Sequence, residues 1–124
     1  MRDENLAVVS GTVTAEPTFG ATGGGVPVAN VRVVAVTERD DGSSAAPQRD
    51  YFNCSYYAPD APERFAGVAP GDRVCLVGRI RSRRSVGADG SSAYHATLVA
   101  SAVSIENDGR KGEGNGTDGS GNGA

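Results

Sequence analysis

Four arginines stand within six residues of the segment VGRIRSRRS (residues 77–85), in a chain of 124 residues whose formal net charge is −3 at pH 7. On an extended strand, Arg79, Arg81 and Arg83 share one side and are spaced about 6 to 7 Å apart. That spacing is comparable to the repeat of an extended phosphodiester backbone, so the row is a candidate site for a polyanion. Arg83 and Arg84 also stand at the expected start of the next loop.

This arginine row also has a simpler explanation. Solvated strand faces and protected sheet edges carry charge in many proteins, so charge alone leaves both interpretations open. Residues 5–107 hold nine arginines and ten acidic residues, a net charge of −1. Anion binding would therefore depend on local geometry, because long-range attraction is weak.

The segment DYFNCSYY (residues 50–57) alternates between two kinds of side chain. Tyr51, Asn53 and Tyr57 share one face of an extended strand. The two tyrosines either expose their rings on this face or are ordinary sheet tyrosines with buried rings and solvated hydroxyls. The other face is assigned to the core or a subunit interface and comprises Phe52, Cys54 and Tyr56.

From the remaining residues that could take part in a reaction or bind a metal, we predict no catalytic activity, no cofactor and no bound metal. His95, the single histidine, is expected at the surface or an interface. Cys54 and Cys75 lack the paired spacing of a zinc site, and we expect both to be reduced and buried. The segment GATGGG (residues 20–25) lacks the lysine and the helix of a phosphate-binding loop.

The pattern of strands and turns predicts an all-β protein. Gly11 and Gly78 fall in mid-strand, as sharp bends at barrel corners require. One short helix of about two turns is expected within residues 59–72, where Asp60 and Glu63 have the spacing of a capping box. The remaining segments are expected to be loops. The five expected strands, which together would form a small closed barrel, are residues 5–15, 27–39, 50–57, 73–82 and 93–105.

Domain organisation follows from length and composition. Residues 1–107 are long enough for one domain with one core. Residues 108–124 contain seven glycines in seventeen residues, and such a segment is expected to be a disordered tail. The N-terminal residues do not fit a signal peptide, and no stretch approaches the roughly 20 apolar residues that cross a bilayer. We therefore expect a soluble, cytoplasmic protein with no membrane partner.

Five segments resemble, in order and spacing, the bacterial and phage single-stranded DNA-binding proteins: NLAVVSGTVTAEP, VPVANVRVVAVT, DYFNCSYY, PGDRVCLVGRIRSRR and LVASAVSI. The resemblance spans roughly residues 5–106. It implies an OB fold, usually a nucleoid-associated homotetramer, that binds single-stranded DNA by stacking bases on aromatic rings in a basic groove, without sequence preference, during replication, recombination or repair. The nucleic-acid-binding residues that it implies are Arg32, Tyr51, Asn53, Tyr57, Arg79, Arg81, Arg83 and Arg84.

The chain departs from the family at several positions. Ser85 and Arg39 stand where relatives carry aromatic residues, and the chain has no tryptophan. We therefore do not expect a very high affinity or a long wrapped binding mode, although Arg39 and Arg84 can replace part of the stacking. The terminal sequence DGSGNGA also lacks the acidic, hydrophobic tip that docks onto partner proteins in the family. These departures leave an alternative function open, an OB-fold protein-interaction module of the primosome type with weak nucleic-acid binding.

Overall fold

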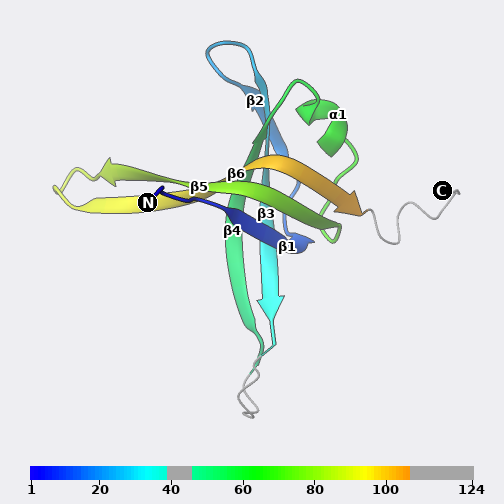
Figure 1. Cartoon of the computed structure of the whole chain (residues 1–124), viewed down its shortest axis with the longest axis horizontal. Helices are drawn as coiled ribbons and strands as arrows, with labels where there is room; N and C mark the ends of the chain where they lie inside the picture. The colour runs from blue at the N-terminus through cyan, green and yellow to red at the C-terminus, as the bar shows by residue number, and fades with distance from the viewer. Residues whose placement is uncertain (39–45, 107–124) are drawn as a thin grey trace, which may run out of the picture.

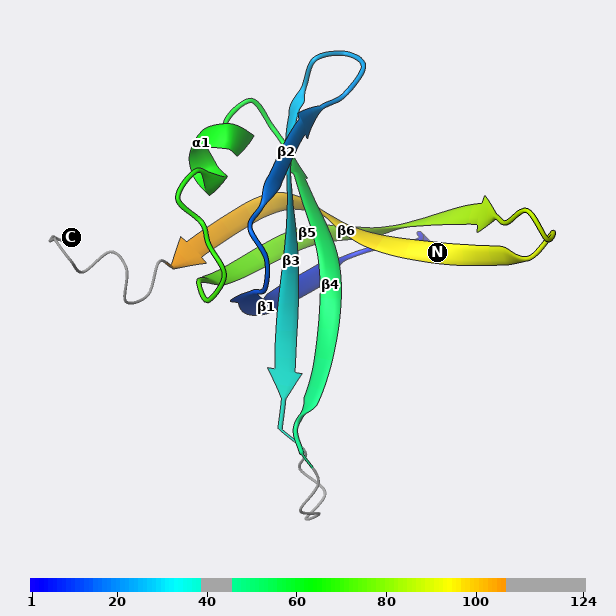
Figure 2. The ribbon, with the colours of Figure 1, turned by 180° about the vertical axis from the view of Figure 1, so that it is seen from behind.

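The computed structural model describes residues 1–38 and 46–106, and β-strands make up most of this part of the chain (Figures 1 and 2). The predicted all-β class is confirmed. Arg39 and the predicted tail of residues 108–124 lie outside the described residues. The elements are β1 (Ala7–Val13), β2 (Thr18–Ala21), β3 (Pro27–Thr37), β4 (Gln48–Tyr57), α1 (Ala61–Phe65), β5 (Arg73–Val86) and β6 (Ser92–Glu106). No helix among the described residues is long and apolar enough to cross a membrane.

Five of the strands form a closed ring. Their order is β1-β5-β6-β4-β3, and β1 returns to pair with β3 through Thr12↔Val34 and Val13↔Val33. β4 and β6 run parallel, whereas the other pairs in the ring are antiparallel. The helix lies between the third and fourth strands of the ring in chain order, as the sequence predicts.

The sixth strand, β2, was not predicted, because residues 16–26 were expected to be a loop. β2 pairs with the first part of β3, from Thr18↔Asn30 to Ala21↔Pro27. The glycine-rich segment closes this hairpin, since the backbone N–H of Gly25 donates to the carbonyl of Thr22 at 2.9 Å and Gly25 has a φ of 89°. The turn therefore needs glycine at this position, and β2 extends the sheet beyond the ring.

The two mid-strand glycines lie where strands approach closely. A Cβ at Gly11 would lie 2.2 Å from the carbonyl oxygen of Val34, and one at Gly78 would lie 1.9 Å from that of Val99. The β5–β6 register also shifts at Gly78. Only a residue without a side chain fits at these two positions, because the neighbouring strand approaches too closely. The sharp bends that the sequence predicts at both glycines stay a prediction.

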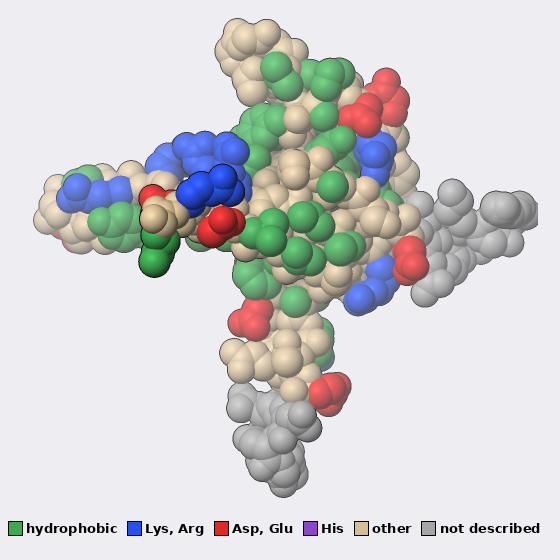
Figure 3. Space-filling model, viewed as in Figure 1, with side chains coloured by type: hydrophobic (Ala, Val, Ile, Leu, Met, Phe, Trp, Pro, Cys, Tyr) green, Lys and Arg blue, Asp and Glu red, His purple; other side chains and the backbone are tan. Residues whose placement is uncertain are grey.

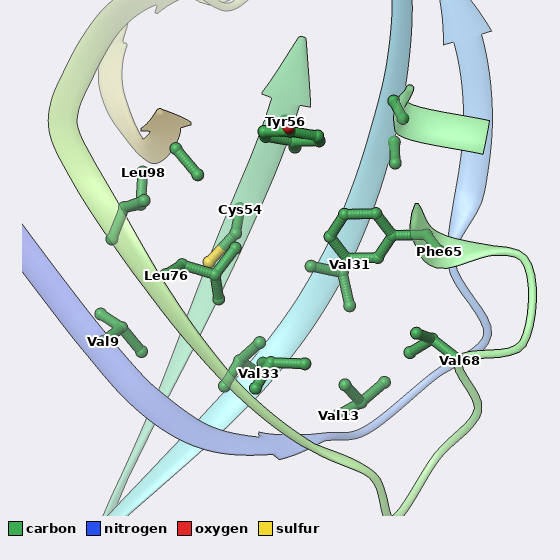
Figure 4. Close-up of a cluster of buried hydrophobic side chains, with 14 residues drawn as sticks. Val9, Val13, Val31, Val33, Cys54, Tyr56, Phe65, Val68, Leu76 and Leu98 are labelled. Atoms are coloured by element: carbon green, nitrogen blue, oxygen red, sulfur yellow. The ribbon is translucent and has the colours of Figure 1, made fainter. Parts of the chain in front are cut away.

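The core fills the interior of the ring and reaches under α1 (Figure 4). Cys54 and Tyr56 are buried, and the partly buried Phe52 packs against the same cluster, so the assignment of this β4 face to the core is confirmed. The rings of Tyr56 and Phe65 lie 5.9 Å apart between centroids. The largest fully buried apolar side chains are Phe65, Leu76, Leu98, Val13, Val33 and Cys54.

The helix is shorter than predicted and its cap differs. α1 has five residues, and the side chain of Asp60 makes no capping hydrogen bond, so the predicted capping box is wrong. The hydroxyl of Tyr56 instead donates to Oδ1 of Asp60 at 3.0 Å. Burial raises the pKa of Tyr56, and the bond to Asp60 raises it further. The carboxylate therefore ties α1 to β4 in place of capping the helix.

The β5–β6 hairpin is also longer than predicted. β5 runs to Val86, and the pairing with β6 continues to Val86↔Ser92. The segment from Arg83 onward, which was expected to open a loop, is therefore strand. Its turn is tied by the N–H of Gly90, which donates to the carbonyl of Gly87 at 3.0 Å. The hairpin projects from the ring as a two-stranded arm (Figure 1).

Candidate nucleic-acid interface

Strand register places the candidate residues of three strands on one outer face of the sheet. Asn53 of β4 lies opposite Arg32 of β3. Ser55, two residues further along β4, pairs with Val99 of β6, and Val99 pairs with Arg79 of β5. Because side chains alternate between faces along each strand, the odd-numbered residues of β4 and the first three arginines of the row project from the same side.

A groove of about 600 Å³ runs along this face, and we call it the arginine groove. A second hollow of about 360 Å³ adjoins it and includes Arg32 and Asn53. Ser55 and Thr97 line both, so the two form one continuous surface. The arginine groove is lined by Ser55, Tyr57, Arg79, Arg81, Ser82, Arg83, His95, Thr97 and Val99.

Among the described residues, no carboxylate forms a salt bridge with an arginine of the row. Within residues 1–38 and 46–106, the salt bridges are Arg2–Glu4 and Arg64–Asp60, and neither involves the groove. All three arginines of the row are exposed. Positively charged side chains, all of them arginine, gather over the β5–β6 arm in the space-filling view (Figure 3). The groove can therefore offer several guanidinium groups to an anionic chain.

Two tyrosines on this face expose their rings. Tyr51 is 54% exposed and Tyr57 is 46% exposed, so the interpretation of buried rings is wrong. The guanidinium carbon of Arg32 lies 5.5 Å from the ring centroid of Tyr51. This cation–π contact holds Arg32 against one face of the ring. Tyr57 lines the arginine groove directly.

Arg84 is separated from the other arginines. It pairs with Tyr94, whereas Arg83 pairs with His95. The next residue, Ser85, is hydrogen-bonded to His95, which places Ser85 on the groove side. Alternation then directs Arg84 to the opposite face of the hairpin, and it does not line the groove. The sequence grouped Arg84 with the row because β5 was expected to end before it.

The N-terminal segment holds β5 in position at the start of the row. Nδ2 of Asn5 donates to the carbonyl of Ile80 at 2.8 Å, and the N–H of Ile80 donates to Oδ1 of Asn5 at 3.0 Å. The side chain of Asn5 thus makes the two hydrogen bonds that a paired strand would make, just beyond the pair Ala7↔Gly78. It fixes the backbone between Arg79 and Arg81.

Five residues that line the groove were not among the site residues predicted from the sequence: Ser55, Ser82, His95, Thr97 and Val99. Ser55 is buried, and its hydroxyl donates to Oδ1 of Asn30 at 2.7 Å. Thr97 and His95 pair with Arg81 and Arg83 across the hairpin. The position of the hairpin turn would have revealed these two pairs, because it sets the register of every pair along both strands.

The thiols and the acidic residues do not suggest metal chemistry. Within the described part of the chain, no three His, Cys, Asp or Glu residues are placed to hold a metal ion. Both cysteines are free. Cys54 is buried, as expected, and burial raises its pKa to about 11. Cys75 is partly exposed, which corrects the prediction that both are buried.

Comparison with known proteins identifies the family. The model of the single-strand binding protein family matches residues 4–106. The chain belongs to this family. It is also 31% identical over 99 residues to the "Single-stranded DNA-binding protein" of Oceanobacillus iheyensis, a match that covers 80% of this chain and 61% of that protein. The chain thus spans about three fifths of the length of this curated relative.

Two solved structures are similar to the single-strand binding family member described here. One is "Plasmodium falciparum SSB complex with ssDNA", with a TM-score of 0.71 and 16% identity, covering 86% of this chain and 96% of that chain. The other is a small single-stranded DNA-binding protein from Streptomyces coelicolor, with a TM-score of 0.69 and 21% identity, covering 86% of this chain and 97% of that chain. The predicted OB fold is confirmed.

Proposed function

We propose that this chain binds single-stranded DNA without sequence preference or catalysis, and that it protects strands exposed during replication, recombination or repair. The observation that carries the proposal is the outer face on which three exposed arginines line one groove with Tyr57, and on which the ring of Tyr51 is also exposed. Backbone phosphates meet guanidinium groups and bases stack on rings, which is the general mode of sequence-tolerant binding to single strands. Membership of the family supports the same function.

Titration of labelled oligo-dT at several salt concentrations tests this function. We expect binding that weakens as salt rises and that exceeds binding to duplex of the same length. The triple change Arg79→Glu, Arg81→Glu and Arg83→Glu should abolish binding and leave the circular dichroism spectrum unchanged, because all three side chains are exposed. Equal affinity of the unaltered chain for duplex would contradict the proposal. So would a triple variant that loses its fold and not only its binding.

The same titration addresses the second candidate, an OB-fold protein-interaction module. The near-neutral charge of residues 5–107 and the absence of tryptophan favour this candidate. A dissociation constant weaker than the micromolar range at physiological salt would support the module over the DNA-binding function.

We further propose that the chain assembles as a homotetramer. The proposal is supported by the resemblance to the family and by exposed apolar side chains outside the groove, such as Leu6 and Val8 of the N-terminal segment and β1. Multi-angle light scattering of the purified chain should give a mass of about four protomers. A monomeric mass over the accessible concentration range would contradict the proposal.

A further inference from the structure

His95 is an aromatic residue at the far end of the arginine groove. The site residues predicted from the sequence do not include it. It lies directly opposite Arg83 on the β5–β6 hairpin and lines the same groove as the arginine row. Its side chain is exposed, and Nε2 lies within hydrogen-bonding distance of Oγ of Ser85, at 3.0 Å. We propose that the imidazole ring of His95 is a base-stacking platform held in place by Ser85. The inference rests on the proposed binding of single-stranded DNA and extends it along the hairpin.

The position relative to Arg83 supports a contact with a base. Side chains directly opposite each other in an antiparallel pair have Cβ atoms about 4.5 to 5.5 Å apart. A nucleotide whose phosphate meets Arg83 therefore has its base within reach of the neighbouring ring. Histidine is among the side chains on which unpaired bases stack.

The hydrogen bond to Ser85 supports a fixed ring orientation. Ser85 and His95 are diagonal neighbours across the hairpin, on the same face as Arg83. A ring that is anchored through one nitrogen loses less side-chain entropy when a base stacks on it than a freely rotating ring does. Ser85 is thus a positioning residue, and His95 is the residue that contacts the base.

The register supplies a matched control on the same strand. Tyr94 precedes His95, is 72% exposed and pairs with Arg84 on the opposite face of the hairpin. It is a larger aromatic side chain in the same part of the arm, and it does not line the groove. A general effect of removing an aromatic ring from the arm should therefore appear equally in Tyr94→Ala and His95→Ala.

The first experiment measures the affinity of the full chain and its variants for oligo-dT across a salt series. We expect His95→Ala to raise the dissociation constant about fivefold to tenfold, within the range of stacking contributions. The slope of affinity against salt should not change, since stacking releases no counterions. His95→Phe should restore the affinity of the unaltered chain, Ser85→Ala should weaken binding less than His95→Ala, and Tyr94→Ala should bind normally.

The second experiment uses the absence of tryptophan from the chain. In His95→Trp the new indole is the sole tryptophan, and its fluorescence should be quenched when oligo-dT binds. In Tyr94→Trp the fluorescence should change little. Quenching confined to position 95 would support the proposal even if one of the alanine variants folds poorly.

Several results would overturn the inference. These are an unchanged dissociation constant for His95→Ala, equal quenching at positions 94 and 95, and a salt slope in His95→Ala whose magnitude falls by about 0.7, which would indicate a phosphate contact. Failure of the unaltered chain to bind oligo-dT would instead overturn the proposed function itself. The unaltered chain is titrated first, so the two failures are distinguishable.

Discussion

The arginines of β5 show how strongly the alternation of a strand decides the role of single residues. Arg81 lines the groove, whereas Arg84 projects from the opposite face of the same hairpin. Both are exposed and have the same chemistry. A comparison of the two therefore separates the effect of position from that of net charge.

The first prediction uses this comparison at the residue scale. Arg81→Gln should weaken oligo-dT binding about fivefold and reduce the magnitude of the salt slope by about 0.7, because one phosphate contact is lost. Arg84→Gln removes the same charge and should leave both quantities nearly unchanged. Fluorescence anisotropy at several salt concentrations measures both. Equal losses in the two variants would show that overall charge matters and position does not.

The second residue-scale prediction concerns the two thiols. Burial raises the pKa of Cys54 to about 11, so at pH 8 it is a protonated thiol, and only the thiolate reacts with alkylating agents. Iodoacetamide at pH 8 should therefore modify the partly exposed Cys75 faster than Cys54 in the folded protein. Mass spectrometry of tryptic peptides gives both rates, and denatured protein, in which both should react, is the control. Comparable rates in the folded protein would be evidence against the described packing around Cys54.

At the scale of elements, the β5–β6 hairpin determines which residues the groove can contain. The β5–β6 register shifts between Val77 and Gly78, immediately before the arginine row, and the far part of the hairpin extends beyond the ring as the arm (Figure 1). The close approach of the carbonyl of Val99 leaves no room for a side chain at Gly78. The geometry of the groove therefore depends on a residue that has no functional group of its own.

The element-scale prediction tests this dependence. Gly78→Ala should reduce the free energy of unfolding by about 1 to 3 kcal/mol, as overpacking does in a well-packed region. Gly20→Ala is the matched control, because its Cβ would meet only Val28 at an ordinary distance of 3.7 Å, and its effect should be within about 0.5 kcal/mol. Urea denaturation measures both. A small and equal effect in the two variants would contradict the close approach at Gly78.

Much of this element structure was predictable from the sequence. Alternation in residues 50–57 separated Tyr51 and Tyr57 from the core side chains, and the two mid-strand glycines mark positions where strands approach closely. The length of the β5–β6 hairpin was not predictable from its outer segments, RRSV (residues 83–86) and SSA (residues 91–93). Neither segment has the composition of a typical turn or of a typical strand. Its pairing depends on cross-strand contacts that a single strand does not reveal. The missed register is why Arg84 was included in the site and His95 was not.

At the scale of the whole molecule, the positive charge is local. The chain has a net charge of −3, yet the row of β5 and Arg32 lie on one continuous surface. Long-range steering of DNA toward such a molecule is weak, so affinity must come from contacts made within the groove. The number of those contacts limits how strongly binding responds to salt.

The whole-molecule prediction is the size of that response. Four arginines on the continuous surface can contact phosphates: Arg32, Arg79, Arg81 and Arg83. For a single strand each contact contributes about −0.7 to the slope of log K against log salt, so an oligo-dT short enough to occupy one chain should give about −3. Titrations at several NaCl concentrations measure the slope, and the triple glutamate variant is the control. A much steeper slope would mean that cations outside this surface bind the strand. A slope near zero would mean that stacking alone holds the DNA strand. The arginine row would then be an ordinary solvated strand face, which is the simpler explanation of its charge.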